Sequence, residues 1–332
     1  MKAFLINKYT KGGLQLTDVS LPKIKNNEVL VEIYATGLNL LDSKIKTGEF
    51  KLILPYKMPL ILGHDLAGIV KEVGKNVKKY NVGDEVYARP TDFHIGTFAE
   101  YITVREEDLA FKPKNLSMEE AASVPLVALT AWQALVEIGR LKKGQKVFIQ
   151  AGSGGVGTIA IQLAKHLGAT VATTASAKSF DFLKEIGADV LIDYKTQDFE
   201  AILKDYDLVL NSQDNKTLEK SLNILKAGGR VISISGPPTP EFAEAIHANW
   251  LVKMVTRFLS FGIKKKAKKL GVDYTFLFMK ADGNQLNEIT KLIESGIIQP
   301  IIDKVFPFGE TNKALEYVEN GRAKGKVVVK IK

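Results

Sequence analysis

The chain has 332 residues, more than the ~250–300 at which single hydrophobic cores stop growing, so two domains are expected. With 45% hydrophobic and 25% charged residues it has the composition of a globular protein. It contains no cysteine, which excludes disulfides, thiolate nucleophiles and cysteine-ligated metals. The net charge of +9 is compatible with nucleic acid, an anionic membrane surface or an anionic cofactor. We find no signal peptide and no membrane span, and expect a cytoplasmic protein.

The first third of the sequence predicts short strands. Val29–Tyr34 alternates and is β-branched, and Leu66–Val73 and Glu85–Ala88 are similar. Glycine and asparagine turn signals separate them, which favours a small antiparallel barrel or curved sheet. Ser117 and Glu120 then form a capping box, which predicts the start of a helix.

From Lys146 onward, strands and helices alternate. This rhythm is typical of a parallel, doubly wound α/β sheet. The tail predicts two amphipathic helices and a closing strand. The expected strands are 146–150, 170–174, 190–192, 208–210, 230–235 and 326–331, and the expected helices are 157–166, 179–186, 217–225, 284–294 and 311–319.

The strongest motif is a glycine loop between an apolar strand and a helix. Gly152, Gly154 and Gly157 satisfy G-x-G-x-x-G in the context that a dinucleotide-binding fingerprint requires. The glycines allow a tight turn, and the helix N-terminus attracts the pyrophosphate. We therefore predict a dinucleotide site that also includes Ser153, Gly155 and Val156. An ordinary glycine-rich turn is the alternative.

The segment about 20 residues after the loop distinguishes NAD from NADP, because an NAD site usually carries an acid there. No acid precedes Asp181 in this segment, which offers instead the hydroxyl of Ser176 and the ammonium of Lys178. Both would hold a 2′-phosphate, and we predict NADPH as the preferred cofactor. The alternative for Lys178 is a solvated lysine at a helix start.

Five lysines crowd the segment Lys264–Lys269. A solvated helix face is the simplest interpretation. Nucleic-acid binding is a second hypothesis, although no known motif or interleaved aromatic residue supports it. Phe258 and Phe261 leave open a contact with a membrane surface.

Taken jointly, eight segments make the sequence resemble the medium-chain dehydrogenase/reductase superfamily over nearly its whole length. Within it, the resemblance is to the zinc-free quinone oxidoreductase and enone reductase branch. The segments are 35–42, 62–68, 81–86, 96–101, 129–132, 151–157, 225–230 and 321–326.

The resemblance implies a β-rich GroES-like catalytic domain, residues 1–122 and 281–332, with a Rossmann NADPH-binding domain inserted at 123–280. It also implies a homodimer and an active site in the cleft between domains. Further cofactor contacts implied in this way are Tyr194 beside the 2′-phosphate, Ser235 and Phe278 beside the nicotinamide, and Lys326 near the phosphates. A turn before the last strand is the alternative for Lys326.

Zinc members of the superfamily use a cysteine where Asn39 stands, together with a histidine at His64. One histidine without a thiol is too few ligands for zinc, so we expect no metal site. His94, His166 and His247 show no metal-ligand spacing.

Reduction without a metal favours a quinone or an α,β-unsaturated carbonyl acceptor, because the resulting anion is less basic than an alkoxide. Asn39 could donate a hydrogen bond to the carbonyl oxygen, and Tyr56 is a candidate proton donor or substrate-facing aromatic. The alternatives are a loop aromatic that packs on the barrel and a proton from water. A single-electron quinone reductase and a catalytically silent NADPH-binding structural or regulatory protein are the competing functions.

Overall fold

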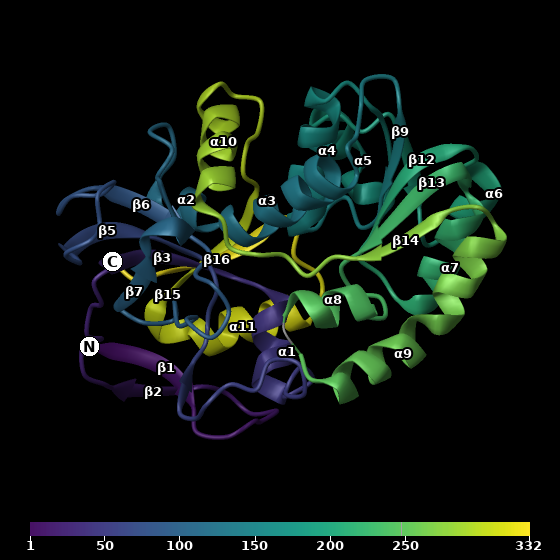
Figure 1. Cartoon of the computed structure of the whole chain (residues 1–332). Helices are drawn as coiled ribbons and strands as arrows, with labels where there is room; N and C mark the ends of the chain where they lie inside the picture. The colour runs from purple at the N-terminus through teal and green to yellow at the C-terminus, as the bar shows by residue number, and fades with distance from the viewer. Residues whose placement is uncertain (247) are drawn as a thin grey trace. The chain divides into compact units, whose positions relative to one another are not determined.

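The computed structural model describes residues 1–246 and 248–332, so His247 lies outside the described residues. The chain divides into two compact units, which are described separately below (Figure 1). Unit 1 comprises Met1–Leu129 and Lys280–Lys332, and unit 2 comprises Thr130–Met279. The segment that forms unit 2 is thus inserted within the sequence of unit 1.

The strands of unit 1 form two sheets. They are β1 (Lys2–Ile6), β2 (Gln15–Asp18), β3 (Glu28–Leu38), β4 (Leu60–Ile61), β5 (Leu66–Val73), β6 (Glu85–Ala88), β7 (Tyr101–Arg105), β8 (Leu109–Phe111), β15 (Ile302–Pro307) and β16 (Lys326–Lys330). In the described residues the larger sheet runs β15-β16-β3-β5-β6-β8, with β7 also paired to β3, and the smaller runs β2-β1-β4. In the larger sheet, every neighbouring pair of strands is antiparallel except β15 with β16.

Strand β3 is the centre of the larger sheet, since it pairs with β16, β5 and β7. The alternation at Val29–Tyr34 predicts a strand with one buried face. Instead, every residue of β3 except Tyr34 is buried, because other parts of unit 1 cover both faces. The apolar cluster on one face includes Val29, Val31, Ile33, Leu66, Val70, Val86 and Ile102.

Unit 2 contains one parallel sheet. Its strands are β9 (Lys146–Ile149), β10 (Thr170–Ala175), β11 (Val190–Asp193), β12 (Tyr206–Asn211), β13 (Leu225–Ser233) and β14 (Asp273–Phe276). Among the described residues the order is β11-β10-β9-β12-β13-β14, and every neighbouring pair is parallel. The sequence order reverses direction between β10 and β12, on either side of β9. Ligands of doubly wound sheets bind at the carboxyl ends of the strands at such a point.

Helices connect the strands in both units. Unit 1 has α1 (Leu40–Thr47), α2 (Met118–Ala122), α10 (Gly283–Glu294) and α11 (Thr311–Glu319), and α3 (Pro125–Trp132) precedes a π-helical turn at Gln133–Ile138. Unit 2 has α4 (Gly155–His166), α5 (Phe180–Glu185), α6 (Phe199–Ile202), α7 (Asn215–Asn223), α8 (Pro240–Ala245) and α9 (Trp250–Lys269). The capping box predicted at Ser117 is confirmed: Glu120 N donates to Ser117 Oγ at 3.2 Å, and Ser117 N donates to Glu120 Oε2 at 2.8 Å.

The α/β class and the parallel sheet predicted from the sequence are confirmed. The sequence did not predict β14, nor did it show that the lysine run ends a helix of twenty residues, α9. Among the residues described, no helix combines the length and apolar character needed to cross a membrane.

Candidate active site

The glycine loop joins the end of β9 to the start of α4 in unit 2. The chain turns sharply at Ala151, whose φ of 51° is uncommon for a residue with a side chain. Gly154 N donates to Ala151 O at 3.0 Å, and Gly152 N donates to Thr174 O at 3.0 Å. These bonds fix the loop against the carboxyl end of β10.

Two of the three fingerprint glycines stand where no side chain fits. A Cβ on Gly152 would lie 2.2 Å from Thr173 Oγ1, and a Cβ on Gly157 would lie 2.4 Å from Ala151 O. Gly154 has an ordinary φ of −84°, and its closest such contact would be 3.3 Å. Gly152 and Gly157 are therefore required by contacts within the protein, whereas at Gly154 the protein leaves space that a pyrophosphate could approach.

The N-terminus of α4 is free to bind an anion. No side chain caps it and its first turn carries no acidic residue. The residues from Ser153 to Val156 are partly exposed, so a ligand can reach their N–H groups. Unpaired N–H groups and the helix dipole together attract a phosphate. The loop thus fits the pyrophosphate of a dinucleotide.

Three predicted cofactor residues follow the carboxyl ends of neighbouring strands. Ser176 and Lys178 come directly after β10, and Tyr194 follows β11. Tyr194 N donates to Ala175 O at 3.3 Å, which ties the two strand ends together. Lys178 and Tyr194 are exposed and Ser176 is half-buried. The arrangement offers a cation, a hydroxyl and an aromatic ring beside the glycine loop, as a 2′-phosphate would require.

A buried polar network that the sequence did not predict joins the ends of β9, β12 and β13. Asn211 Nδ2 donates to Gln150 Oε1 at 2.7 Å, and Ser233 Oγ donates to Asn211 Oδ1 at 2.6 Å. Gln150 Nε2 in turn donates to Ser221 Oγ of α7 at 2.7 Å. Because each of these amides is satisfied within the protein, the network positions the strand ends.

The two residues predicted to lie beside the nicotinamide are already in contact with other parts of unit 2. Ser235 Oγ donates to Gln213 O at 2.6 Å. The half-buried ring of Phe278 lies 5.2 Å from the ring of Phe242 in α8. Ser235 follows β13 and Phe278 follows β14, so both stand past the carboxyl ends of adjacent strands.

Unit 1 holds a buried cluster around Asp65 that includes Asn39 and Lys326. Lys326 Nζ donates to Asn39 Oδ1 at 2.7 Å, to Asp65 Oδ2 at 3.0 Å and to Leu38 O at 2.9 Å. Asn39 Nδ2 donates to Asp65 Oδ2 at 2.9 Å and to Gly37 O at 3.4 Å. The amide of Asn39 and the ammonium of Lys326 thus have partners at every polar position.

Asp42 and His64 form a second buried pair in unit 1. His64 Nδ1 lies 2.6 Å from Asp42 Oδ1, and both side chains are fully buried. The other carboxylate oxygen of Asp42 accepts a hydrogen bond from Asn39 N at 2.8 Å. His64 Nε2 is buried without a hydrogen-bond partner among the described residues.

Tyr56 lies in the loop between α1 and β4 and is almost fully buried. Its ring is 5.2 Å from the ring of Phe93. Its buried hydroxyl lies near the Phe93 backbone but makes no hydrogen bond of ordinary geometry with the described part of the chain. Burial raises the pKa of this hydroxyl, and the nearby Asp92 carboxylate adds to the effect. Tyr56 therefore remains a neutral hydrogen-bond donor across the physiological pH range.

The side chains of unit 1 do not make a zinc site. Within residues 1–246 and 248–332 no three His, Asp or Glu side chains gather as metal ligands, and the chain has no cysteine. Zinc binding needs three or four converging ligands. Asp65 is already paired with the ammonium of Lys326, whose charge would repel a second cation. The donor set therefore does not fit the metal.

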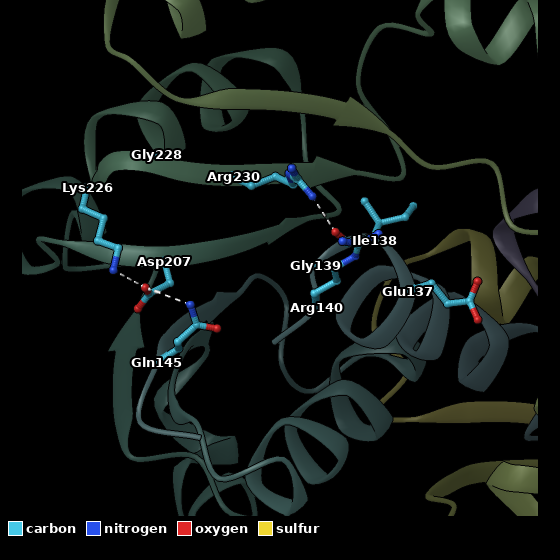
Figure 2. Close-up of a pocket in the computed structure, with 9 residues that line it drawn as sticks. All are labelled: Glu137, Ile138, Gly139, Arg140, Gln145, Asp207, Lys226, Gly228 and Arg230. Carbon is cyan, nitrogen blue, oxygen red and sulfur yellow. Dashed lines mark hydrogen bonds and ion pairs between the residues drawn. The ribbon is translucent and has the colours of Figure 1, made fainter. Parts of the chain in front are cut away.

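A pocket of about 670 Å³ lies at the amino ends of β12 and β13 (Figure 2). The glycine loop, in contrast, follows the carboxyl end of β9. Asp207 near the start of β12 accepts hydrogen bonds from Gln145 at 3.2 Å and pairs with Lys226 at 2.5 Å. Arg230 donates to Ile138 O and pairs with Asp273 at the start of β14. Because the pocket lies at the amino ends of these strands, whereas doubly wound sheets bind their ligands at the carboxyl ends, it is not the dinucleotide site.

Comparison with known proteins places this chain in a family. The family model for an alcohol dehydrogenase GroES-like domain matches residues 25–114, and the one for a zinc-binding dehydrogenase matches residues 186–329. The zebrafish (Danio rerio) NAD(P)H oxidoreductase RTN4IP1, mitochondrial, is 35% identical over 100% of this chain and 91% of its own length. The chain belongs to the medium-chain dehydrogenase/reductase superfamily. Its branch is that of the quinone and alkenal/one oxidoreductases.

Two further proteins, one curated relative and one solved structure, are similar to this chain over nearly its whole length. The NADPH-dependent alkenal/one oxidoreductase, chloroplastic, of Arabidopsis thaliana is 33% identical over 99% of this chain and 79% of its own length. The solved structure of the quinone oxidoreductase from Coxiella burnetii superposes with a TM-score of 0.88 and 31% identity, covering 100% of this chain and 99% of that one. The GroES-like fold and the family predicted from the sequence are thereby confirmed.

Proposed function

We propose that this superfamily member is an NADPH-dependent reductase that transfers a hydride to a quinone or an α,β-unsaturated carbonyl compound without zinc. The observation that carries the proposal is the glycine loop at the uncapped start of α4, with Ser176, Lys178 and Tyr194 at the adjoining strand ends. The names of the quinone and alkenal/one reductases that resemble the chain support the choice of acceptor.

The residues assigned to the cofactor have distinct roles in this proposal. The N–H groups of Ser153, Gly155, Val156 and Gly157 bind the pyrophosphate, which approaches closely at Gly154. Ser176 and Lys178 bind the 2′-phosphate beside Tyr194. Ser235 and Phe278 orient the nicotinamide, which supplies the hydride when the coenzyme is bound. We assign these roles to residues 123–280 and the acceptor site to residues 1–122 and 281–332.

A conjugated acceptor explains how the reaction proceeds without a Lewis acid. The hydride is added to the conjugated system, and the electron pair is delocalised onto oxygen as an enolate or a hydroquinone anion. The hydroxyl of Tyr56 has no partner of its own and stays neutral, so it is the donor we assign to that oxygen. The final proton comes from water in this scheme.

Asn39 and Lys326 serve this site indirectly in our proposal. Asn39 could donate to a carbonyl oxygen only by giving up Asp65 or Gly37. Lys326 could reach a cofactor phosphate only by leaving three acceptors. We therefore propose that they hold the N-terminus of α1 in place. The homodimer and the cytoplasmic location remain predictions.

The test is the rate of NADPH oxidation by the purified full chain with quinones, enones, simple aldehydes and saturated ketones. We expect turnover with the first two classes and no loss after treatment with a chelator. Robust oxidation of simple alcohols, or activity that a chelator abolishes and zinc restores, would contradict the proposal. Tight NADPH binding with no turnover on any acceptor would favour the silent NADPH-binding protein instead.

A further inference from the structure

Helix α9 turns its large apolar side chains away from the protein. Figure 1 shows it as a long helix beside α7 and α8 in unit 2. Trp250 and Phe258 are 73% and 74% exposed, and they belong to one stripe over the first three turns. The other exposed members are Leu251, Met254, Val255, Leu259 and Phe261.

The inward face of α9 is the less hydrophobic one. Its buried residues are Thr256, Ser260, Ile263 and Ala267. Ser260 Oγ donates to Thr256 O at 2.7 Å, and Thr256 Oγ1 donates to Lys253 O at 2.9 Å, so these hydroxyls are satisfied within the helix. A surface helix normally buries its apolar stripe. The inverted pattern leaves an apolar patch that requires an occupant.

The charges of α9 indicate which occupant fits. The helix has seven cations, Lys253, Arg257, Lys264, Lys265, Lys266, Lys268 and Lys269, and no anion. Lys253, Lys264 and Lys266 form ion pairs with Glu244, Glu241 and Glu219. Arg257, Lys268 and Lys269 form no ion pair with the described residues. The helix dipole accounts for cations in the last turn but not for the aromatic stripe.

We propose that α9 docks the protein on the surface of an anionic lipid bilayer. A helix with exposed Trp, Phe and Leu beside lysines lies in the interface, with its apolar face ~5–10 Å into the headgroup and acyl boundary. Trp250 and Phe258 insert at that depth, and Lys268 and Lys269 face the phosphates. The proposal is independent of the reaction and deals only with where the protein resides.

A second copy of the chain or a nucleic acid would match either the apolar stripe of α9 or its cations, but not both. A second copy would bring together two helices of like charge, which opposes close contact of the apolar stripes. A nucleic acid would use the lysines but would leave Trp250, Leu259 and Phe261 in water. An anionic bilayer satisfies both the apolar stripe and the unpaired cations.

The experiment measures co-sedimentation of the full chain with vesicles of phosphatidylcholine, alone or with about 30% phosphatidylglycerol. We expect binding to the anionic vesicles only, weakened at about 0.5 M salt. The Lys268→Gln/Lys269→Gln variant should bind roughly 30-fold more weakly. The Trp250→Ser/Phe258→Ser variant should lose at least ~10-fold in affinity while its Tm does not fall.

Matched controls separate a local site from bulk charge or hydrophobicity. Lys8→Gln/Lys11→Gln removes two exposed cations elsewhere, and Leu52→Ser removes another exposed apolar side chain. Neither control should change vesicle binding. The proposal is overturned if the wild-type chain ignores anionic vesicles, or if the α9 variants bind them as the controls do. It is also overturned if light scattering without lipid shows an oligomer that Trp250→Ser/Phe258→Ser converts to monomers.

Discussion

Asp65 accepts a hydrogen bond from the ammonium of Lys326 at 3.0 Å, although 261 positions separate the two residues in the chain. Both side chains are buried. Lys326 begins β16, which pairs with β3, and Asp65 lies just before β5 on the other side of β3. The pair therefore attaches the last strand of the chain to the segment before β5, which carries His64. Asn39, just past the end of β3, contacts both members of the pair.

Replacing Lys326 by Met should destabilise the protein strongly. The substitution leaves the Asp65 carboxylate buried without its cation, and removal of one partner from a buried pair costs about 3–5 kcal/mol. The free energy of unfolding, measured with urea, checks the value. Lys330→Met is the matched control, since that exposed lysine pairs with Glu119 at the surface and should change stability by less than about 1 kcal/mol.

The double variant Lys326→Met/Asp65→Asn distinguishes a charge effect from a packing effect. Because the second substitution removes the uncompensated charge, the double variant should be more stable than Lys326→Met alone. A double variant as unstable as the sum of the single variants would show that the two side chains are not energetically coupled.

Those parts of the site that depend on local sequence were predictable. The glycine loop between β9 and α4 is contiguous, and strand, turn and helix each leave their own pattern. Ser176 and Lys178 are predictable as candidates in the same way, because they follow the next strand at a known interval. In both cases, residues that are close in the sequence are also close in the structure.

The contacts of Lys326 could not be predicted, because its partners come from β3, the N-cap of α1 and the segment before β5. The network of Gln150, Asn211 and Ser233 joins three strands in the same manner. Polar residues at strand ends are common, and only strand order decides which of them meet. The sequence did not show which face of α9 is exposed, because both faces of its first three turns contain apolar or small residues.

Gly152→Ala should weaken NADPH binding by at least ~10-fold. The new Cβ would lie 2.2 Å from Thr173 Oγ1, so the loop must move and misplace the N–H groups of α4. Gly309→Ala is the matched control, since nothing lies within 4 Å of the Cβ that it would add and the residue lies outside the glycine loop. Titration of protein fluorescence with NADPH gives both dissociation constants. Equal affinities for the two variants would contradict the assigned loop geometry.

Lys178→Met should lower the affinity for NADPH by roughly 10-fold and leave the affinity for NADH nearly unchanged. A charge-assisted bond to the 2′-phosphate contributes about 1.5–3 kcal/mol, and NADH has no such group. Lys184→Met, an exposed lysine of the following helix, supplies the control. Calorimetry with both coenzymes measures the effect. Parallel losses for NADPH and NADH would place Lys178 outside the phosphate site.

Glu32 should make the stability of unit 1 depend on pH in the acidic range. Burial by itself would raise its pKa, but bonds from Lys332, Lys71 and Tyr101 outweigh this and lower the pKa from 4.5 to about 2. A lowered folded-state pKa adds stability above about 4.5, and this stability is lost as the pH falls toward 2. Glu32→Gln should therefore destabilise the protein by about 1–2 kcal/mol at neutral pH and much less near pH 3.

Urea midpoints at the two pH values test this dependence. Glu49→Gln, which removes an exposed partner of Lys44 at 3.7 Å, should have little effect at either pH. A Glu32→Gln deficit that is the same at both pH values would assign the loss to packing rather than to ionisation.

Tyr56→Phe should reduce kcat by roughly 100- to 1,000-fold without reducing stability. The hydroxyl has no hydrogen-bond partner among the described residues, so the folded protein loses no bond when it is removed. Loss of a donor to a developing oxyanion does slow turnover by such factors. Tyr80→Phe is the inverse control, because its hydroxyl donates to Leu109 O at 2.6 Å. That variant should lose stability and keep its kcat.

Since burial raises the pKa of Tyr56, its ionisation should add no alkaline limb to the pH profile of kcat below about pH 10. An unchanged kcat for Tyr56→Phe with both a quinone and an enone would remove this tyrosine from the mechanism.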